Sequence, residues 1–380
     1  MSVRPVVAHF RAIYLQRSET FIYRYLSHLT RVWPVVFAQA VQHLDEFPVP
    51  TLETYPPLRW SAWGIRDRLG RRQGREPFLA WRIRRLGAVL LHAHFGPQGH
   101  ALLPLRRQTG LPMVTSFYGY DMSMLPRDPE WRARYADLFA GGDCFLVEGR
   151  GMKERLAALG CPPEKIRLQR IAIDLDLLPF RERRGHPGPV RLLFCARFSE
   201  KKGLLDALRA AAAARDRGVD LAFRIVGDGE LRDEVERTIQ ELRLERVVQL
   251  LGMRPYADVL RELESADLLI QPSRTAADGD TEGGAPTILL EAQASGLPVL
   301  STRHADIPDV VAEGKSALLA PEGDWEALAD HLAALCREPE RWAEMGRAGR
   351  GHVAEAHDIR AEARRLEEIY FGLAGIRGSG

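Results

Sequence analysis

The chain has 380 residues, 46% of them hydrophobic, and a formal net charge of +2. That length suits two domains rather than one, and so small a net charge gives no reason to expect nucleic-acid binding. The four cysteines are scattered without Cys-x-x-Cys spacing, which argues against a disulfide framework or a zinc site and predicts a reducing compartment. The first apolar run, Val3 to Phe10, carries Arg4 and His9, so we predict a strand there, no signal peptide or membrane span, and a cytoplasmic protein.

Short β-branched or aromatic runs alternate with helical patterns along the whole chain, which predicts an α/β protein with parallel sheets and crossover helices. In the first half we predict strands at 4–10, 32–38, 89–95, 112–118, 143–147 and 166–171. In the second half we predict strands at 190–197, 221–227, 246–251, 267–271, 298–302 and 316–320. The helical patterns cover 19–29, 98–109, 130–140, 150–159, 203–217, 229–243, 256–265, 287–295, 324–336 and 339–355.

The segment Pro179–Pro189 combines three prolines, two glycines and a charge cluster, which is typical of a linker. We therefore predict two doubly wound domains, 1–178 and 190–357. A last helical stretch, about 359–373, follows the second domain and is a candidate to cross back onto the first. Ligands of such sheets bind at the carboxyl ends of the strands, so the loops that follow strands are the ones to inspect.

Two features of the first domain precede its third predicted strand. Ser18 follows the first strand as a candidate N-cap in a loop expected to meet a ligand. The segment 59–85 is rich in arginine and interleaved with Trp60, Trp63, Phe78 and Trp81. This composition fits a surface that binds peripherally to the inner face of the membrane and recognises a lipid-linked acceptor. It fits equally well an exposed pair of helices with a solvated, arginine-rich face.

Two further loops of the first domain carry polar candidates. His92 and His94 alternate on one strand and so share a face, but a lone His-x-His without a carboxylate at ligand spacing is too little for a metal site. Asp121 follows the next strand, where it could contact an acceptor, orient a neighbour or simply cap a turn.

Three strand-end loops of the second domain follow the linker. Arg197 and Lys202 fall in a strand-to-helix loop, where cations would clamp a diphosphate, although a solvated charged loop is the alternative. Lysine is rare in this chain, so the adjacent lysines at 201–202 stand out. Gly227 permits a tight turn and close approach of a ligand. Arg254 lies in a turn that could present backbone groups to a nucleobase, or could be an ordinary turn.

The most informative segment is Glu282-Gly-Gly-Ala-Pro-Thr-Ile-Leu-Leu-Glu291. Pro286 suits the first helical position and Gly296 a left-handed cap, and the residues between them, Thr287 to Ser295, are predicted to be helical. The N–H groups at such a helix start attract a phosphate. The two carboxylates can each accept the paired hydroxyls of a ribose or a hexose. A phosphate site flanked by two such carboxylates has the shape of a nucleotide-sugar site.

These second-domain motifs, followed by Ala-x-Ala-x-Gly-Leu-Pro-Val, resemble the family 4 glycosyltransferases over about 190–305. The resemblance implies retaining enzymes of the GT-B fold, in which two doubly wound Rossmann-like domains face a cleft. The Ser-Glu-Thr-Phe motif that begins at Ser18 also resembles family members that build bacterial exopolysaccharides, including colanic-acid-type enzymes.

The resemblance also implies roles for particular residues. Glu291 would bind the donor ribose, and Arg197 and Lys202 the diphosphate. His94 would bind the donor sugar, or it could instead be a histidine of the core or one that supports the site from behind. The donor sugar would also face Glu282 and the groups after it, namely Gly283, Gly284, Ala285, Thr287 and Ile288. This chain departs from the family by placing eight residues rather than seven between the two glutamates. Glycine can absorb that insertion as a bulge, and Asp278 or Asp280 could substitute for Glu282.

The predicted reaction moves a hexose from a UDP-sugar or GDP-sugar to a hydroxyl of a glycan or lipid-linked acceptor, with retention. The resemblance implies that the leaving diphosphate takes the acceptor proton while Arg197, Lys202 and the helix start at 287–288 stabilise its charge. Because those groups would neutralise the diphosphate, neither a metal nor another cofactor is expected. The alternatives are a sugar-nucleotide epimerase, a phosphorylase, which would need a pyridoxal lysine that the chain does not convincingly offer, and a non-catalytic nucleotide-sugar-binding protein.

Overall fold

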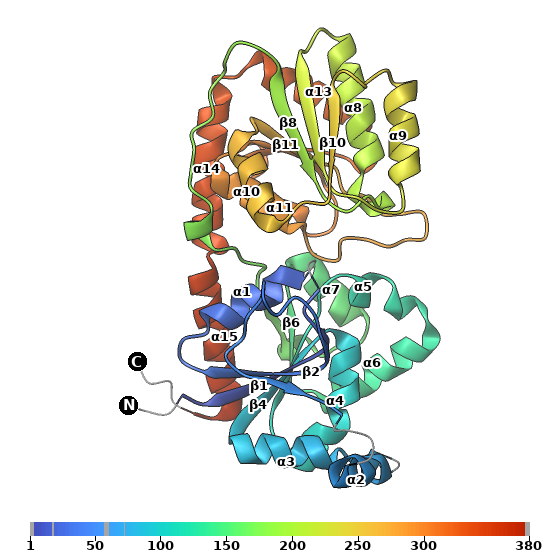
Figure 1. The fold of residues 1–380 in the computed structure, drawn as a ribbon, viewed down its shortest axis with the longest axis vertical. Coiled ribbons are helices and arrows are strands. Elements are labelled where there is room, and N and C mark those ends of the chain that lie inside the picture. The colour runs from blue at the N-terminus through green and yellow to red at the C-terminus, as the bar shows by residue number, and fades with distance from the viewer. Residues whose placement is uncertain (1–3, 17–18, 57–60, 72, 377–380) are drawn as a thin grey trace. The chain divides into compact units, whose positions relative to one another are not determined.

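The computed structural model describes residues 4–16, 19–56, 61–71 and 73–376. The chain divides into two compact units, each built around its own parallel sheet (Figure 1). The first unit comprises the chain up to Ala172 together with the segment from Ile359 onward. The second comprises Ile173–Asp358.

The first unit contains a seven-stranded sheet in the order β3-β2-β1-β4-β5-β6-β7. Its pairings are parallel throughout. The strands are β1 (Val6–Tyr14), β2 (Trp33–Val41), β3 (Leu52–Thr54), β4 (Ala88–His94), β5 (Met113–Ser116), β6 (Cys144–Val147) and β7 (Ile166–Leu168). In the central pair, His9 of β1 lies opposite His92 of β4.

Two hydrophobic clusters cover the two faces of this sheet, because successive side chains of a strand point to opposite faces. The helices of the unit are α1 (Thr20–His28), α2 (Ala62–Arg71), α3 (Pro77–Leu86), α4 (Gly96–Thr109), α5 (Tyr120–Ser123), α6 (Pro129–Gly141), α7 (Arg150–Ala158) and α15 (Ile359–Ala374). Leu79, Leu102, Leu138 and Met152 pack into one cluster, and Ile22 and Leu26 of α1 pack into the other.

The last helix, α15, packs on the first unit beside α1 and β4 (Figure 1). Leu366, Tyr370 and Phe371 are buried in the same cluster as α1. The carboxylate of Glu367 accepts hydrogen bonds from the backbone N–H groups of residues 30 and 31, at 2.7 and 2.6 Å. The chain therefore returns from the second unit to complete one face of the first unit.

The second unit contains a six-stranded parallel sheet in the order β10-β9-β8-β11-β12-β13. Its strands are β8 (Val190–Cys195), β9 (Leu221–Val226), β10 (Val248–Gly252), β11 (Leu268–Gln271), β12 (Val299–Thr302) and β13 (Ala317–Ala320). Its helices are α8 (Leu204–Asp216), α9 (Arg232–Glu241), α10 (Tyr256–Ser265), α11 (Thr287–Ser295), α12 (Ile307–Val310), α13 (Trp325–Arg337) and α14 (Arg341–Ala356). Helix α8 packs against α13, and α11 packs against α14 and α10.

The division between the units falls at Ala172–Ile173 rather than within Pro179–Pro189, where the composition predicts a linker. That segment lies against the second unit. The backbone N–H of Arg181 bonds to the carbonyl of Ser295, and the guanidinium of Arg183 bonds to the carbonyl of Leu263. Backbone and guanidinium hydrogen bonds thus attach this segment to the second unit, although its composition alone predicts a flexible linker.

All of the predicted strands and helices are present, with small shifts at their ends. The sequence patterns missed β3, α5 and α12, and they gave the helices α2 and α3 only as one of two interpretations of the segment 59–85. Strand β3 is a three-residue edge strand, and α5 and α12 have four residues each, too few to show a period. The pair α2–α3 corresponds to the exposed helix pair that was one of two readings of 59–85.

Among the described residues, no helix combines the length and the apolar character needed to cross a bilayer. The cysteines are all free thiols. Cys144 and Cys161 are buried, where burial raises the pKa of each thiol, to about 11 and about 12. They behave as small core residues.

Candidate functional site

The order of the second sheet identifies where a ligand would bind. From β8 the chain proceeds to β9 and β10 on one side, and it then returns to β11 on the other side. In open parallel sheets ligands occupy the crevice at such a reversal, outside the carboxyl ends of the strands. The loops after β8 and β11 flank that position, and they carry the predicted cations and Glu282.

Lys202 and Glu282 meet at this position. Lys202 ends a short 3-10 helix (η5, Glu200–Lys202) after β8, and its Nζ lies 2.5 Å from Oε2 of Glu282. The other carboxylate oxygen of Glu282 accepts a 2.7 Å hydrogen bond from the hydroxyl of Ser273, which follows β11. The side chains of Lys202 and Glu282 are 19% and 5% exposed, so the pair is shielded but reachable.

The electrostatics of Glu282 follow from this pairing. Burial by itself would raise the pKa of the carboxyl, but the charge and the hydrogen bond of Lys202, with help from Ser273 and Lys201, hold the pKa below its ordinary value. The carboxylate is therefore ionised at neutral pH and can accept hydrogen bonds from hydroxyl groups.

A second lysine–acid pair lies next to the first. Lys201 Nζ is 2.7 Å from Asp280 Oδ2 and 3.1 Å from the carbonyl oxygen of Thr281. Asp278 accepts a 2.8 Å hydrogen bond from the backbone N–H of Asp280. The two lysines thus contact the loop at 280–282, where Asp280 pairs with Lys201 and Asp278 bonds to the backbone of the loop.

The loop before α11 contains a glycine in the left-handed region. Gly283 has φ +80°, a conformation that favours glycine and is compatible with a bulge at this position. Gly284 and Ala285, which follow it, are buried. Arg197, by contrast, is exposed in the loop after β8, and among the described contacts it is Lys202 that pairs with Glu282.

Helix α11 begins at Thr287 and ends at Ser295, as the sequence predicts, with Gly296 in the left-handed cap at φ +89°. Pro286 is the N-cap, with an extended ψ of 128°, rather than the first helical residue. Glu291 is buried on this helix, 5% exposed, and accepts a 3.1 Å hydrogen bond from the hydroxyl of Tyr256 at the start of α10. Its backbone is fixed by a fully packed helix, which gives the carboxylate a defined position.

The two remaining candidates of this unit lie in neighbouring strand-end loops. Gly227 has φ +142°, and a Cβ there would come within 1.9 Å of the carbonyl oxygen of Ala196. Its glycine is therefore required by the neighbouring backbone, whatever ligand may approach. Arg254 is exposed between β10 and α10.

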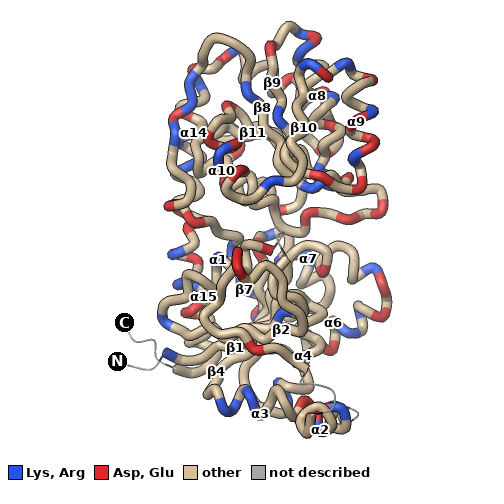
Figure 2. The backbone as a smooth tube through the Cα atoms, viewed as in Figure 1, with Lys and Arg blue, Asp and Glu red and all other residues tan. Residues whose placement is uncertain are grey.

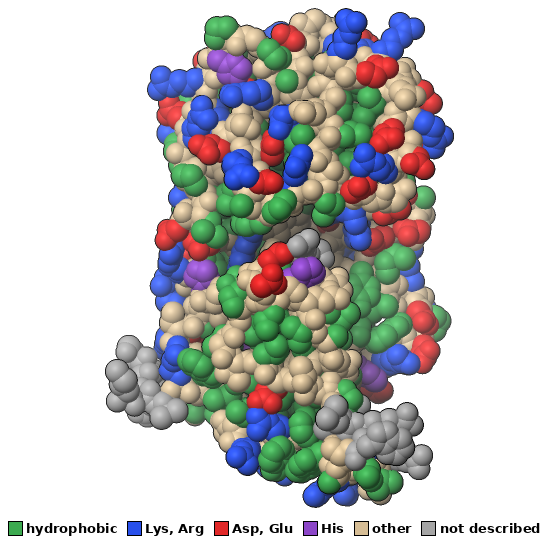
Figure 3. All heavy atoms as spheres, in the orientation of Figure 1, with side chains coloured by type: hydrophobic (Ala, Val, Ile, Leu, Met, Phe, Trp, Pro, Cys, Tyr) green, Lys and Arg blue, Asp and Glu red, His purple; other side chains and the backbone are tan. Residues whose placement is uncertain are grey.

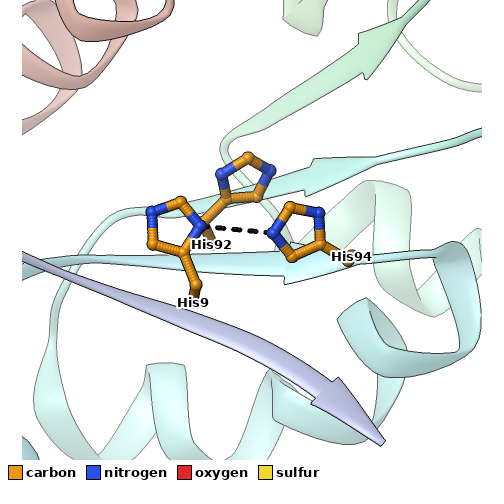
Figure 4. A group of neighbouring side chains, drawn as sticks. All are labelled: His9, His92 and His94. Carbon is orange, nitrogen blue, oxygen red and sulfur yellow. Dashed lines mark hydrogen bonds between the residues drawn. The ribbon is translucent and has the colours of Figure 1, made fainter. Parts of the chain in front are cut away.

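In the first unit, the predicted His-x-His pair is joined by a third histidine. His92 and His94 extend from one face of β4, and His9 of β1 lies beside them (Figure 4). All three are buried, and one ring nitrogen of each lies within 4.8 Å of the others. The sequence places His9 only in a predicted strand. It lies beside His92 and His94 because β1 pairs with β4, which the sequence does not show.

Ring nitrogens of these histidines make hydrogen bonds to one another or to neighbouring hydroxyl groups. His94 Nε2 lies 3.2 Å from His9 Nδ1, and His94 Nδ1 lies 2.8 Å from the Tyr118 hydroxyl. His92 lies 2.5 Å from the hydroxyl of Tyr370 on α15 and 2.8 Å from that of Ser116. Both nitrogens of His92 and both of His94 therefore already have partners.

Burial governs the charge of these histidines. It lowers the pKa of His9 to about 3, and with the neighbouring rings it holds the pKa of His92 and of His94 well below the ordinary value. The rings are neutral. A cavity of about 30 Å³, room for about one water molecule, adjoins His9 and His94. A hydrogen bond from His94 to a sugar would have to replace one that it makes here.

Asp121 ties together the two loops that follow β4 and β5. Its fully buried carboxylate accepts hydrogen bonds from the backbone N–H groups of Gly96 and Tyr118, each at 3.0 Å. Burial raises its pKa to about 6, and the two backbone hydrogen bonds oppose that rise. Of the three roles open to Asp121, this geometry fits that of a residue that orients its neighbours.

Replacing Asp121 by asparagine should destabilise the protein by about 1–3 kcal/mol. The amide NH2 group of asparagine would take the place of one carboxylate oxygen and would face a backbone N–H, so that two donors would oppose each other. Urea unfolding followed by circular dichroism measures this. The exposed Asp137→Asn on the nearby helix α6 is the matched control. Equal stability of the two variants would contradict the bridging role.

The first predicted site residue, Ser18, lies outside the described residues. Its neighbour Glu19 is buried and forms a two-pronged ion pair with Arg11 of β1, at 3.0 and 2.6 Å. The guanidinium of Arg11 in turn lies over the ring of Phe95, 4.3 Å from its centroid.

The basic and aromatic segment forms a compact helix pair. Trp63 of α2 stacks on Trp81 of α3, with 4.8 Å between ring centroids. The acid Asp67 is buried between the helices, whereas Ile65 and Leu69 are 47% and 56% exposed. The exposed residues also include the arginines Arg66, Arg68, Arg75, Arg84 and Arg85.

Basic residues recur along α3 in Figure 2, and Figure 3 shows basic and hydrophobic side chains together at this end of the first unit. We call this surface the α2–α3 surface. Trp60, Arg59 and Arg72 of the predicted segment lie outside the described residues.

Several residues of the site escaped the sequence patterns. No motif in the sequence predicts a particular role for Ser273, Tyr256, His304 or Glu322. His304 Nε2 accepts the backbone N–H of Glu282, at 3.2 Å, and its Nδ1 lies 2.7 Å from Glu322. No local pattern marks these residues, because each follows a different strand and meets its partner only when the sheet forms.

Comparison with protein families gives two matches. Residues 180–352 match the family described as glycosyl transferases group 1, and residues 18–177 match glycosyltransferase family 4. Together the two matches extend over most of both units.

Individual relatives agree with the family matches. The amylovoran biosynthesis glycosyltransferase AmsK of Erwinia amylovora is 36% identical over 289 residues, which are 76% of this chain and 71% of that protein. WcaL of Salmonella typhimurium, named for colanic acid biosynthesis, is 38% identical over 247 residues, 64% of this chain. The chain spans about three fifths of the length of WcaL, 61%.

Solved structures share the fold. The Anabaena protein HepE in complex with UDP superposes with a TM-score of 0.78 at 15% identity, covering 97% of this chain and all of that one. Sucrose-phosphate synthase from Thermosynechococcus elongatus gives 0.74 at 17% identity, covering 98% and 100%. These neighbours are GT-B glycosyltransferases, so the architecture of two Rossmann-like domains is that of the GT-B fold.

Proposed function

Since the chain belongs to the family 4 glycosyltransferases, we propose that it transfers a hexose from a nucleotide-diphosphate sugar to a hydroxyl group, with retention of anomeric configuration. The observation that carries this proposal is the cluster of Lys202, Glu282 and Ser273 at the strand reversal beside the start of α11. It combines a cation for a phosphate with an ionised acceptor for sugar hydroxyls.

The proposed donor site lies in the second unit. Glu291 would accept the ribose hydroxyls, while Lys202, Arg197 and the N–H groups of Thr287 and Ile288 would hold the diphosphate. The donor sugar would meet Glu282, the segment 283–285 and, from the first unit, His94. We propose UDP or GDP as the nucleotide. The structural neighbour HepE is described in complex with UDP and with UDP-glucose, which supports a uridine donor.

The proposed bond changes balance without a further reagent. The bond between the anomeric carbon and the diphosphate oxygen breaks, and the acceptor oxygen bonds to the same face of that carbon. The acceptor proton passes to the leaving diphosphate oxygen. Lys202, Arg197 and the start of α11 would stabilise the negative charge that develops there, as preorganised cations and dipoles do in other transfer reactions.

The test is an assay with UDP-, GDP- and ADP-sugars, with and without glycan and lipid-linked acceptors. Transfer should release nucleoside diphosphate in proportion to product, and NMR of the new linkage should show the donor's anomeric configuration. Conversion of the donor sugar to its epimer without an acceptor would identify an epimerase instead. Binding of nucleotide sugars without any turnover would identify a non-catalytic binding protein.

We propose that no metal takes part, because the lysine and arginine cations can neutralise the diphosphate. Dialysis against EDTA should therefore leave the transfer rate within about twofold of its starting value. The histidine cluster of His9, His92 and His94 is the position where a metal would be sought among the described residues. A rate that falls with EDTA and returns only with a divalent ion would contradict the proposal. Loss of that response in His9→Gln would locate the metal at the histidine cluster.

We further propose that the acceptor is a glycan or a lipid-linked sugar and that the α2–α3 surface contacts an anionic membrane. The support is the exposure of its arginines beside Ile65 and Leu69, with Asp67 turned inward. Each basic residue near an anionic surface contributes about 1 kcal/mol of attraction.

The double variant Arg66→Gln/Arg85→Gln should therefore bind vesicles containing phosphatidylglycerol roughly tenfold or more weakly than the parent protein. Sedimentation with vesicles measures this. Arg132→Gln, which removes an exposed arginine of α6, is the control. Equal binding to purely zwitterionic phosphatidylcholine vesicles, or no loss in the double variant, would rule out an electrostatic membrane contact.

A further inference from the structure

Three neighbouring strands of the second sheet end in residues that are tied to one another. Thr275 follows β11, His304 follows β12 and Glu322 follows β13. One carboxylate oxygen of Glu322 lies 2.7 Å from His304 Nδ1, and the other accepts the backbone N–H of Thr275 at 2.8 Å. His304 Nε2 in turn accepts the backbone N–H of Glu282 at 3.2 Å.

The tautomer of His304 follows from its partners. The carboxylate of Glu322 only accepts, so Nδ1 must carry the proton, and the backbone N–H of Glu282 only donates, so Nε2 must offer a lone pair. His304 is 1% exposed, which keeps water from replacing either partner. A single carboxylate therefore holds both ends of the loop 275–282, one end directly and the other through the imidazole.

This loop is the one that carries Asp280 and Glu282 to the two lysines. A neighbouring tie supports the same region, since the N–H of Asp306, two residues after His304, bonds to the carbonyl of Gly284 at 3.3 Å. The loop after β12 thus fixes the backbone on both sides of Gly283.

We propose that His304 and Glu322 are positioning residues, which fix the backbone at Glu282 and thereby place its carboxylate against the donor sugar. The inference rests on the proposed function for its kinetic consequence. Its structural consequence, the protection of two backbone N–H groups, does not depend on activity. Neither side chain contacts Lys202 or the ribose ligand Glu291 in the described contacts, so nucleotide binding should not depend on them.

The variant Glu322→Gln tests this with little change of shape. If its amide nitrogen faces His304, the imidazole must shift its proton to Nε2, which then opposes the N–H of Glu282. If the nitrogen faces Thr275, it opposes that N–H instead. One tie is lost in either orientation. The matched control is Glu313→Gln, which removes a carboxylate paired with the exposed Arg303 in the same region.

The first readout is hydrogen exchange of the backbone amides of Thr275 and Glu282, followed by NMR in the full-length protein. Glu322→Gln should speed exchange at one or both amides by roughly tenfold or more, whereas Glu313→Gln should leave both unchanged. Unchanged exchange in Glu322→Gln would overturn the proposal even if the protein has no transferase activity.

The second readout is kinetic. Glu322→Gln should lower kcat/KM for the donor sugar by about 10- to 100-fold, as displacement of a positioned group does, while the Kd for UDP or GDP stays within about twofold. Equal losses in nucleotide affinity and in kcat/KM would overturn the positioning role. So would a kcat/KM no different from that of Glu313→Gln.

Rescue by shape distinguishes a specific role of His304 from general packing. The amide oxygen of His304→Gln can reach the Nε2 position and accept from Glu282, whereas the amide of His304→Asn ends near Nδ1 and can serve only Glu322. His304→Gln should therefore retain more transfer activity and more protection of the Glu282 amide. The reverse order would overturn the assignment. Absence of all turnover in the parent protein would instead refute the proposed function, and the exchange experiment would still decide the inference.

Discussion

Replacing Lys202 by methionine is expected to lower kcat for sugar transfer by roughly 100- to 1,000-fold, the usual cost of removing one group that stabilises charge in a transition state. Lys202 is the cation that pairs with Glu282 at the strand reversal. Steady-state kinetics with the donor identified by the assay measures the loss. Lys315→Met, an exposed lysine of the same unit, is the control.

The comparison with Lys201→Met sharpens this prediction. Lys201 contacts Asp280 and the carbonyl of Thr281, so its loss should disturb the loop and reduce activity less than the loss of Lys202. If both variants lose activity equally, Lys202 has no special part in neutralising the leaving group. If Lys202→Met keeps its rate, the proposed site is wrong.

The same substitution should also change stability, with a definite dependence on pH. Removing Lys202 leaves the buried carboxylate of Glu282 without its closest cation, which costs about 3 kcal/mol. The pair holds the pKa of Glu282 below its ordinary value of 4.5, so its stabilisation is present above pH 4.5 and is lost as the pH falls through the lower folded-state pKa. The stability difference between parent and variant should therefore close in acid.

Urea unfolding at neutral pH and at a pH well below 4.5, past the lowered folded-state pKa of Glu282, measures this difference. The double variant Lys202→Met/Glu282→Gln should recover much of the stability at neutral pH, because neither charge is then buried alone. It should not recover activity. A stability gap that is the same at both pH values would show that Glu282 is not the group that depends on Lys202.

The second large effect is expected at Glu291. Glu291→Ala should weaken nucleotide binding by roughly 10- to 100-fold, which corresponds to the loss of hydrogen bonds to a charged group worth about 1.5–3 kcal/mol. The buried carboxylate is held on α11 and contacts Tyr256 at 3.1 Å. Isothermal titration with UDP, GDP and ADP measures the affinities, and the exposed Glu344→Ala is the control.

A chemical change in the ligand isolates the ribose contact. The parent protein should bind a 2′,3′-dideoxy nucleotide about as weakly as Glu291→Ala binds the ordinary one. The variant should hardly distinguish the two ligands, because the hydroxyls and their acceptor are removed in turn. If Glu291→Ala still discriminates between them as the parent does, another residue binds the ribose.

The sequence predicted most of the fold because the signals for parallel α/β structure are local. Helix α11 illustrates this, since Pro286 before its start and Gly296 after its end define both of its ends, which match the structure. Edge strand β3 and the helix pair α2–α3 show the limit. A three-residue strand has no period to detect, and the sequence left a helix pair open only as one of two readings of the basic segment.

The candidate site was predictable in its residues but only partly in its contacts. Lys202 and Glu282 could each be placed in a strand-end loop from the chain alone, yet their pairing depends on β8 lying beside β11. Asp121 could be placed next to the first-unit loops, but only the structure assigns both of its oxygens to the N–H groups of Gly96 and Tyr118.

The sequence by itself determined the alternation of strands and helices, the ends of α11 and the two glutamates that bracket its start, because these depend on neighbours within a few residues. Tertiary structure decided which distant groups meet. It brings His9 to His92 and His94, returns α15 to the first unit, and places His304 and Glu322 behind Glu282. Those contacts depend on strand order and on burial, which no local pattern encodes.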